Sequence, residues 1–193
     1  MSSGRLEAFS DGVIAVLITI MVLELRPPEG STFNDLREAH LIPQLLVYLL
    51  SFVYLAIYWN NHHHLLQAAH HVDGRILWAN MHLLFWLSLV PFTAAWMGEN
   101  GFAAIPTAAY GVVLLMSGVA FNFLVRALIA HGDEHSAIAE AIGQDAKGKI
   151  SLVVYLLAIP IALVWPLVAF AIYIAVALVW FVPDRRIASR LVD

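Results

Sequence analysis

The chain contains no cysteine and has few charged residues. Without cysteine it has neither disulfides nor thiolate metal ligands. Only 12% of the 193 residues are charged, about half of the roughly 25% typical of soluble domains. Long polar segments are also missing, because the longest, residues 26–40 and 131–149, are loop-sized. The second of these lacks the Asp-x-Asp-x-Asp-Gly spacing of a calcium loop. No soluble domain and no nucleic-acid partner are expected.

What the chain does have is apolar sequence, which makes up 61% of its residues. About 20 apolar residues in a helix cross the roughly 30 Å of hydrocarbon in a bilayer. Six apolar stretches are present: residues 6–25, 41–66, 76–97 and 102–130 reach that length, and the shorter 150–164 and 167–182 follow. We therefore expect an all-α integral membrane protein whose single domain, residues 1–193, has six transmembrane helices.

The last two stretches are separated only by Trp165 and Pro166. Together they hold roughly 33 residues, too many for one crossing, so a tight hairpin is favoured over one long broken helix. Pro160 should kink the fifth span. The first stretch should remain in the mature protein, because acids precede it and no small-residue cleavage site follows it.

Basic residues give the expected orientation. With a cytoplasmic amino terminus and six spans, only Arg26 and Arg37 fall outside. The inside set is Arg5, Arg75, Arg126, Lys147, Lys149, Arg185, Arg186 and Arg190. This distribution fits the positive-inside rule and predicts that both termini face the cytoplasm.

The first span has one narrow apolar face on a helical wheel. Its members are Phe9, Val16, Ile20 and Leu23. Gly12 and Thr19 flank this face and permit close approach of another helix, whereas Asp11 points to the other side. Such a seam packs against copies of itself around an axis. Ordinary packing or lipid contact is the alternative explanation.

The histidines at 62–64, 70–71 and 82 suggest a metal or haem site, but neighbouring histidines on a helix point in different directions. No metal and no cofactor are therefore expected, although a histidine-bound metal or haem is kept as an alternative function. An enzyme is not expected, because Ser10 and Asp11 diverge by about 100° and cannot easily align with one imidazole such as His82. A secondary transporter is a further alternative, although no inverted repeat is visible.

Three motifs resemble one membrane protein family. They are Arg5-x-x-x-Phe9-Ser10-Asp11 in the first span, Tyr58-Trp59-x-x-His62-His63 in the second, and Leu77-Trp78-x-Asn80 through Pro91-Phe92 in the third. In order and position they resemble the prokaryotic members of the endosomal and lysosomal transmembrane potassium channel family. The resemblance implies a homotetramer in the inner membrane of a prokaryote, in which the first helices line a central pore.

The resemblance also implies which residues form the pore constriction. Val16, Ile20 and Leu23 match the positions that form an apolar constriction, with valine standing where an isoleucine is expected. The chain has no Thr-Val-Gly-Tyr-Gly filter. The permeant ion would be K⁺, with other monovalent cations less favoured.

The polar residues that open the first span are expected to support the pore rather than to touch ions. Arg5, Ser10 and Asp11 need hydrogen-bond partners inside a membrane protein, and Arg5 is one candidate partner for Asp11. The candidates from the second and third spans are His63, Trp78, Asn80 and His82.

Overall fold

A computed structural model describes residues 2–38, 40–69, 72–131 and 146–181. Within these ranges all regular secondary structure is helical, which confirms the all-α prediction. The helices are α1 (Ser3–Leu23), α2 (Phe33–Glu38), α3 (Leu41–Gln67), α4 (Gly74–Ser88), α5 (Val90–Glu99), α6 (Ala104–His131), α8 (Ala146–Val164) and α9 (Pro166–Phe181). Predictions for His70, His71, the acidic loop 132–145 and the basic tail after residue 181 lie outside the described residues.

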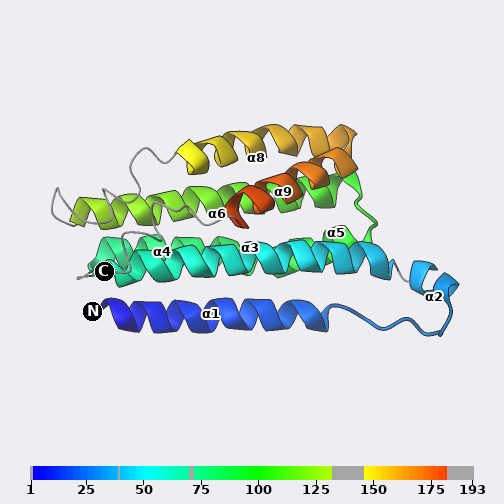
Figure 1. The fold of residues 1–193 in the computed structure, drawn as a ribbon, viewed down its shortest axis with the longest axis horizontal. Coiled ribbons are helices and arrows are strands. Elements are labelled where there is room, and N and C mark those ends of the chain that lie inside the picture. The colour runs from blue at the N-terminus through cyan, green and yellow to red at the C-terminus, as the bar shows by residue number, and fades with distance from the viewer. Residues whose placement is uncertain (1, 39, 70–71, 132–145, 182–193) are drawn as a thin grey trace.

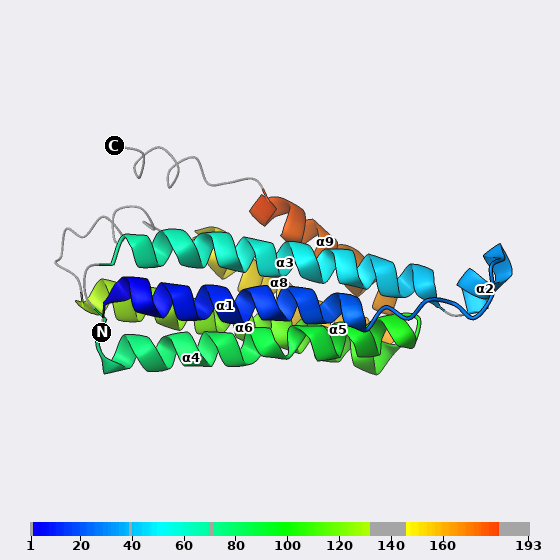
Figure 2. The ribbon, with the colours of Figure 1, turned by 90° about the horizontal axis from the view of Figure 1, so that it is seen from below.

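The long helices run up and down in one bundle (Figure 1). The starts of α1, α4 and α8 lie at one end with the finish of α3 and α6, while the short helix α2 lies at the other end. Helix α1 contacts α3, α4 and α5 and forms one side of the bundle, as Figures 1 and 2 both show. Helices α6, α8 and α9 pack together on the far side of α3, α4 and α5.

Five segments are long and apolar enough to cross a membrane: α1, α3, the α4–α5 pair, α6 and α8. The predicted third span is thus two consecutive helices. Helix α4 ends at Ser88 and α5 begins at Val90, because Pro91 has no N–H to continue the hydrogen-bond ladder of α4 and suits the first turn of a new helix.

Helices α8 and α9 pack on each other as a hairpin that turns at Trp165. The 16 residues of α9 rise about 24 Å, less than the roughly 30 Å of hydrocarbon. Six complete crossings therefore remain a prediction. Pro160 lies inside α8 without ending the helix.

Buried tyrosines attach this hairpin to α3. The Tyr155 hydroxyl donates to the Tyr54 hydroxyl at 3.0 Å, and Tyr54 in turn donates to the backbone carbonyl of Tyr173 at 2.6 Å. On the α6 side, Tyr110 and Ser51 share a hydrogen bond of 2.9 Å. Because each hydroxyl has a partner, these aromatic rings fill the core without leaving an unpaired polar group.

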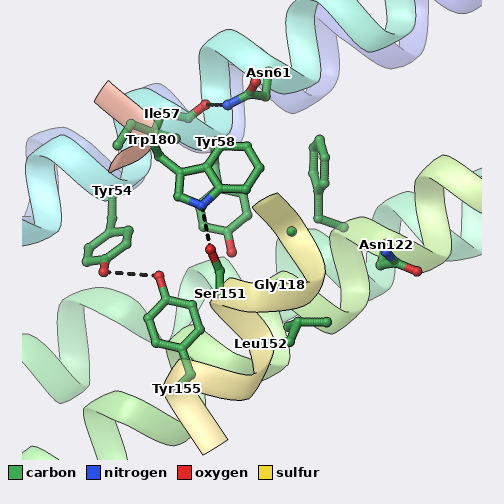
Figure 3. A pocket seen from close by; sticks show the side chains of 12 residues that line it. Tyr54, Ile57, Tyr58, Asn61, Gly118, Asn122, Ser151, Leu152, Tyr155 and Trp180 are labelled. Carbon is green, nitrogen blue, oxygen red and sulfur yellow. Dashed lines mark hydrogen bonds between the residues drawn. The ribbon is translucent and has the colours of Figure 1, made fainter. Parts of the chain in front are cut away.

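A cavity of about 60 Å³ adjoins the tyrosines between α3, α6, α8 and α9 (Figure 3). Tyr54, Tyr58, Tyr155 and Trp180 line it, and the Trp180 indole donates a 2.8 Å hydrogen bond to the Ser151 hydroxyl. A space of this size with polar groups on its wall suits ordered water rather than a large ligand.

Helix α6 packs closely against α8 and α9 at Gly111. A Cβ placed on Gly111 would collide with the hydroxyl of Tyr173, and it would lie 3.2 Å from Ile159 Cγ1. Both Tyr173 and Gly111 are buried, so neither has free space into which to move. Gly111 is thus required for the close packing of α6 against α8 and α9.

Replacing Gly111→Ala should lower stability by about 1–3 kcal/mol, because the added methyl group overpacks a buried contact. Thermal unfolding of the detergent-solubilised protein measures the loss. Gly74→Ala is the matched control, since a Cβ at Gly74 has no neighbour within 4 Å. Equal melting temperatures for the two variants would contradict this account of the packing.

Candidate functional site

Helix α1 has a buried face and an exposed one. The buried face repeats at intervals of three and four residues, as expected for one side of a helix. Its members are Leu6, Ser10, Ile14, Leu17 and Met21. Since α1 contacts α3, α4 and α5, these side chains are covered by the other helices of the same subunit.

The apolar seam predicted from the wheel lies on the exposed side. The exposed fractions are 52% for Phe9, 52% for Val16, 40% for Ile20 and 76% for Leu23. Thr19 is also exposed, and its hydroxyl donates to the carbonyl of Val16 in the same helix at 2.9 Å. A Cβ on the flanking Gly12 would meet no atom within 4 Å. Among the residues that the structure describes, no other helix closely covers this face of the isolated subunit.

Behind the exposed face, three fully buried polar side chains connect α1, α3 and α4. Asn80 Nδ2 donates to Ser10 Oγ at 2.9 Å, and Asn80 Oδ1 lies 2.7 Å from His62 Nε2. Ser10 Oγ donates onward to the Leu6 carbonyl at 2.9 Å. All three residues are 0% exposed. Because Asn80 Oδ1 can only accept, His62 must carry its proton on Nε2, and its Nδ1 is left without a partner.

A second polar group lies at the start of α1. Asp11 Oδ1 accepts a 3.0 Å hydrogen bond from Trp59 Nε1, and Glu7 Oε1 lies 2.7 Å from His63 Nδ1. The Trp59 and His63 rings are stacked, with centroids 5.8 Å apart. The two acids of α1 are thus both directed at α3.

Three expected pairings are wrong. Asp11 bonds to Trp59 and forms no ion pair with Arg5, which is exposed, because six residues place Arg5 about 240° away around the helix. Trp78 and His82 do not join the polar network either. Each is two residues from Asn80, so each points about 200° away from it. Trp78 is 77% exposed, and His82 instead accepts a 2.9 Å hydrogen bond from Trp86.

Trp59, His62 and Glu7 were not expected in the network. Trp59, His62 and His63 are spaced by three and four residues, and Glu7 and Asp11 by four, so each set lies on one helix face. Polar residues spaced by one helical turn at neighbouring ends of the first two spans were the signal that could have identified these partners.

Known proteins resemble this chain in sequence and in fold. A model of the family described as "Endosomal/lysosomal potassium channel TMEM175" matches residues 5–91, which run from α1 into the start of α5. A potassium channel of Chryseobacterium sp. (strain P1-3) is 49% identical over 191 residues, covering 99% of this chain and 98% of that protein. The chain belongs to the TMEM175 family. The predicted resemblance, the potassium-channel class and the expectation that the chain is not an enzyme are thereby confirmed.

A solved TMEM175 structure has the same fold. The crystal structure of a lysosomal potassium-selective channel TMEM175 homolog from Chamaesiphon minutus superimposes with a TM-score of 0.78 at 26% identity. The match covers 95% of this chain and 97% of that one. A human relative, described as an endosomal/lysosomal proton channel, is 25% identical over 130 residues, which are 66% of this chain and 25% of that protein. This chain is therefore a multi-pass membrane protein with the TMEM175 fold.

Replacing Asn80→Leu should lower stability by about 2–4 kcal/mol, because it leaves the His62 Nε2 donor and the Ser10 acceptor buried without their partner. Thermal unfolding in detergent tests this. Asn60→Leu, which changes an exposed amide on α3, should alter stability by no more than about 0.5 kcal/mol. An unchanged melting temperature for Asn80→Leu would show that the buried trio of Ser10, His62 and Asn80 does not hold α1 in place.

Proposed function

We propose that this TMEM175-family chain conducts K⁺ through a central pore of a homotetramer, with α1 of each subunit facing the axis. The observation that carries the proposal is the uncovered apolar face of α1 in a subunit whose other α1 face is closely packed. Val16, Ile20 and Leu23 would form successive constricting rings, flanked by Gly12 and Thr19. Lipid can also cover apolar faces, so the face is assigned to a subunit interface because Gly12 and Thr19 flank it and permit the close approach of another helix.

Such rings control conduction by determining whether water fills the pore, because they offer the ion no ligand atoms. Valine, isoleucine and leucine have no oxygen to replace a hydration shell, and a narrow apolar tube can empty of water and stop conduction. K⁺ gives up water more readily than Na⁺, so the pore should favour K⁺ while admitting other monovalent cations. Thr19, which is exposed beside the seam, would supply a hydroxyl to this pathway. The rings would thus serve as gate and as coarse filter.

The buried trio of Ser10, His62 and Asn80 and the Asp11–Trp59 hydrogen bond would support this pore from the side of α1 that faces its own subunit. Ser10 and Asn80 hold the rotation of α1, so that the apolar face turns outward from the subunit. The polar side chains of the family signature therefore act on structure and do not touch the ion.

Basic residues at the two ends of the bundle support a cytoplasmic amino terminus. Arg26 follows α1 and Arg37 lies in α2, at the end of the bundle opposite the start of α1. The other end holds the described residues Arg5, Arg75, Arg126, Lys147 and Lys149. By the positive-inside rule the start of α1 would face the cytoplasm. The bacterial relatives support the inner membrane of a prokaryote.

Ile20→Ala and Leu23→Ala should each increase K⁺ flux and reduce selectivity over Na⁺, because a smaller side chain widens an apolar ring and favours its wetting. Flux from liposomes under a K⁺ or Na⁺ gradient measures both effects. Val22→Ala is the matched control, since Val22 is 47% exposed on the same helix but lies outside the seam. Unchanged flux in both seam variants would remove this face from the pore.

Because the chain has no cysteine, a single introduced cysteine reports proximity between subunits. Leu23→Cys should give linked dimers with a short bis-maleimide in membranes, since Leu23 would face its copies across the axis. Leu156→Cys on α8 is the control, with a side chain 59% exposed but far from α1. Cross-linking at Leu156→Cys and not at Leu23→Cys would place a different face at the interface.

A further inference from the structure

Three side chains from two helices converge at the start of α1. Glu7 and Asp11 are one turn apart on α1, and His63 reaches them from α3. One ligand atom from each lies within 4.8 Å of the other two. The sequence does not predict a metal site here, because the spacing of histidines within one helix cannot reveal acids that lie on another helix.

The contact inside this cluster is short but is not a hydrogen bond. His63 Nδ1 lies 2.7 Å from Glu7 Oε1, yet it is buried and has no aligned hydrogen-bond partner. An imidazole nitrogen this close to two carboxylates brings together three groups of the types that protein metal sites use as ligands. The exposed fractions of the His63 and Glu7 side chains are 30% and 17%, so the subunit itself does not fully enclose them.

Trp59 orients two of the three side chains. Its Nε1 donates to Asp11 Oδ1, which leaves the other carboxylate oxygen free, and its ring stacks on His63. Partners of this kind orient the ligands in protein metal sites and strengthen binding. The cluster therefore has both ligand atoms and the support that holds them.

We propose that Glu7, Asp11 and His63 form a binding site for a divalent transition-metal ion such as Zn²⁺. One imidazole nitrogen with two carboxylate oxygens is a ligand set that Zn²⁺ accepts, with water in the fourth position. The two carboxylates match the charge of a divalent ion. K⁺, Mg²⁺ and Ca²⁺ prefer oxygen ligands alone, so the imidazole favours a transition metal over them. Bond lengths near 2 Å require the three side chains to close in by small rotations.

A bound ion would join α1 to α3. This consequence depends on the proposed function: if α1 lines the pore, an ion that fixes α1 against α3 restricts the movement that opens it. The site itself does not depend on conduction. Binding and flux are therefore measured separately.

Zn²⁺ binding to the purified wild-type protein, free of any polyhistidine tag, is measured by calorimetry in detergent. Saturable binding is expected. Glu7→Gln and His63→Gln should each weaken it by roughly tenfold or more, because each removes one ligand. Glu24→Gln, just past the end of α1, and His82→Gln on α4, whose ring pairs with Trp86, are the matched controls and should bind as the wild type does.

Trp59→Phe provides a milder variant in case loss of a ligand disturbs folding, which size-exclusion chromatography reports. Phenylalanine keeps a ring beside His63 and loses the hydrogen bond to Asp11, so Zn²⁺ affinity should fall roughly tenfold. Wild-type protein that does not bind Zn²⁺, or ligand variants that bind as tightly as the controls, would overturn the site. Equally tight binding of Ca²⁺ would overturn its assignment to a transition metal.

The consequence for conduction is tested in liposomes with Zn²⁺ on both sides of the membrane. Zn²⁺ should lower K⁺ flux through the wild type and not through Glu7→Gln. Zn²⁺ that binds without changing the flux would refute the coupling to the pore while leaving the site in place. Protein that shows no K⁺ flux under any condition would instead refute the proposed function, and calorimetry would still decide the metal site.

Discussion

Buried polar groups inside a membrane bundle need hydrogen-bond partners, and this requirement fixes the rotation of α1 about its own axis. An unpaired polar group in hydrocarbon costs several kcal/mol. Ser10, Asn80 and His62 are wholly buried and meet only when α1 has one particular rotation against α3 and α4. Turning α1 by one residue would separate Ser10 from Asn80. The same rotation exposes the apolar face, so the orientation of the proposed pore surface follows from hydrogen bonding on the opposite side of the helix.

Helix α1 thus combines two kinds of chemistry in 21 residues. Its polar positions occur in the first half, where Glu7, Ser10 and Asp11 contact α3 and α4. Its second half is apolar around most of its surface and carries Ile20 and Leu23 outward. This division separates the part of the helix that is anchored from the part proposed to constrict a pore. A contact that tightens the anchored half is well placed to influence the other half, since a helix transmits rotation along its length.

Much of the fold could be predicted from the chain alone. Apolar length located the long helices to within a few residues, although the structure divides the predicted third span into two helices at Pro91. The local pattern also identified the exposed face of α1. The partners of the polar residues were harder to predict. Asn80 was expected beside the first span and lies there, but Trp78 and His82 were grouped with it although helical geometry turns both away. Trp59 was missed because an indole at a span boundary also suits the lipid interface.

The sequence by itself determined the membrane class, the helical content and the two faces of α1, because each depends on residues within a few turns of one another. Only the tertiary structure decided which side chains meet between helices. Trp59 bonds to Asp11 across 48 positions, and Asn80 bonds to Ser10 across 70. Such contacts depend on the rotation and spacing of packed helices, to which the whole bundle contributes. The cluster of Glu7, Asp11 and His63 exists for the same reason: no local pattern brings an acid of the first span to an imidazole of the second.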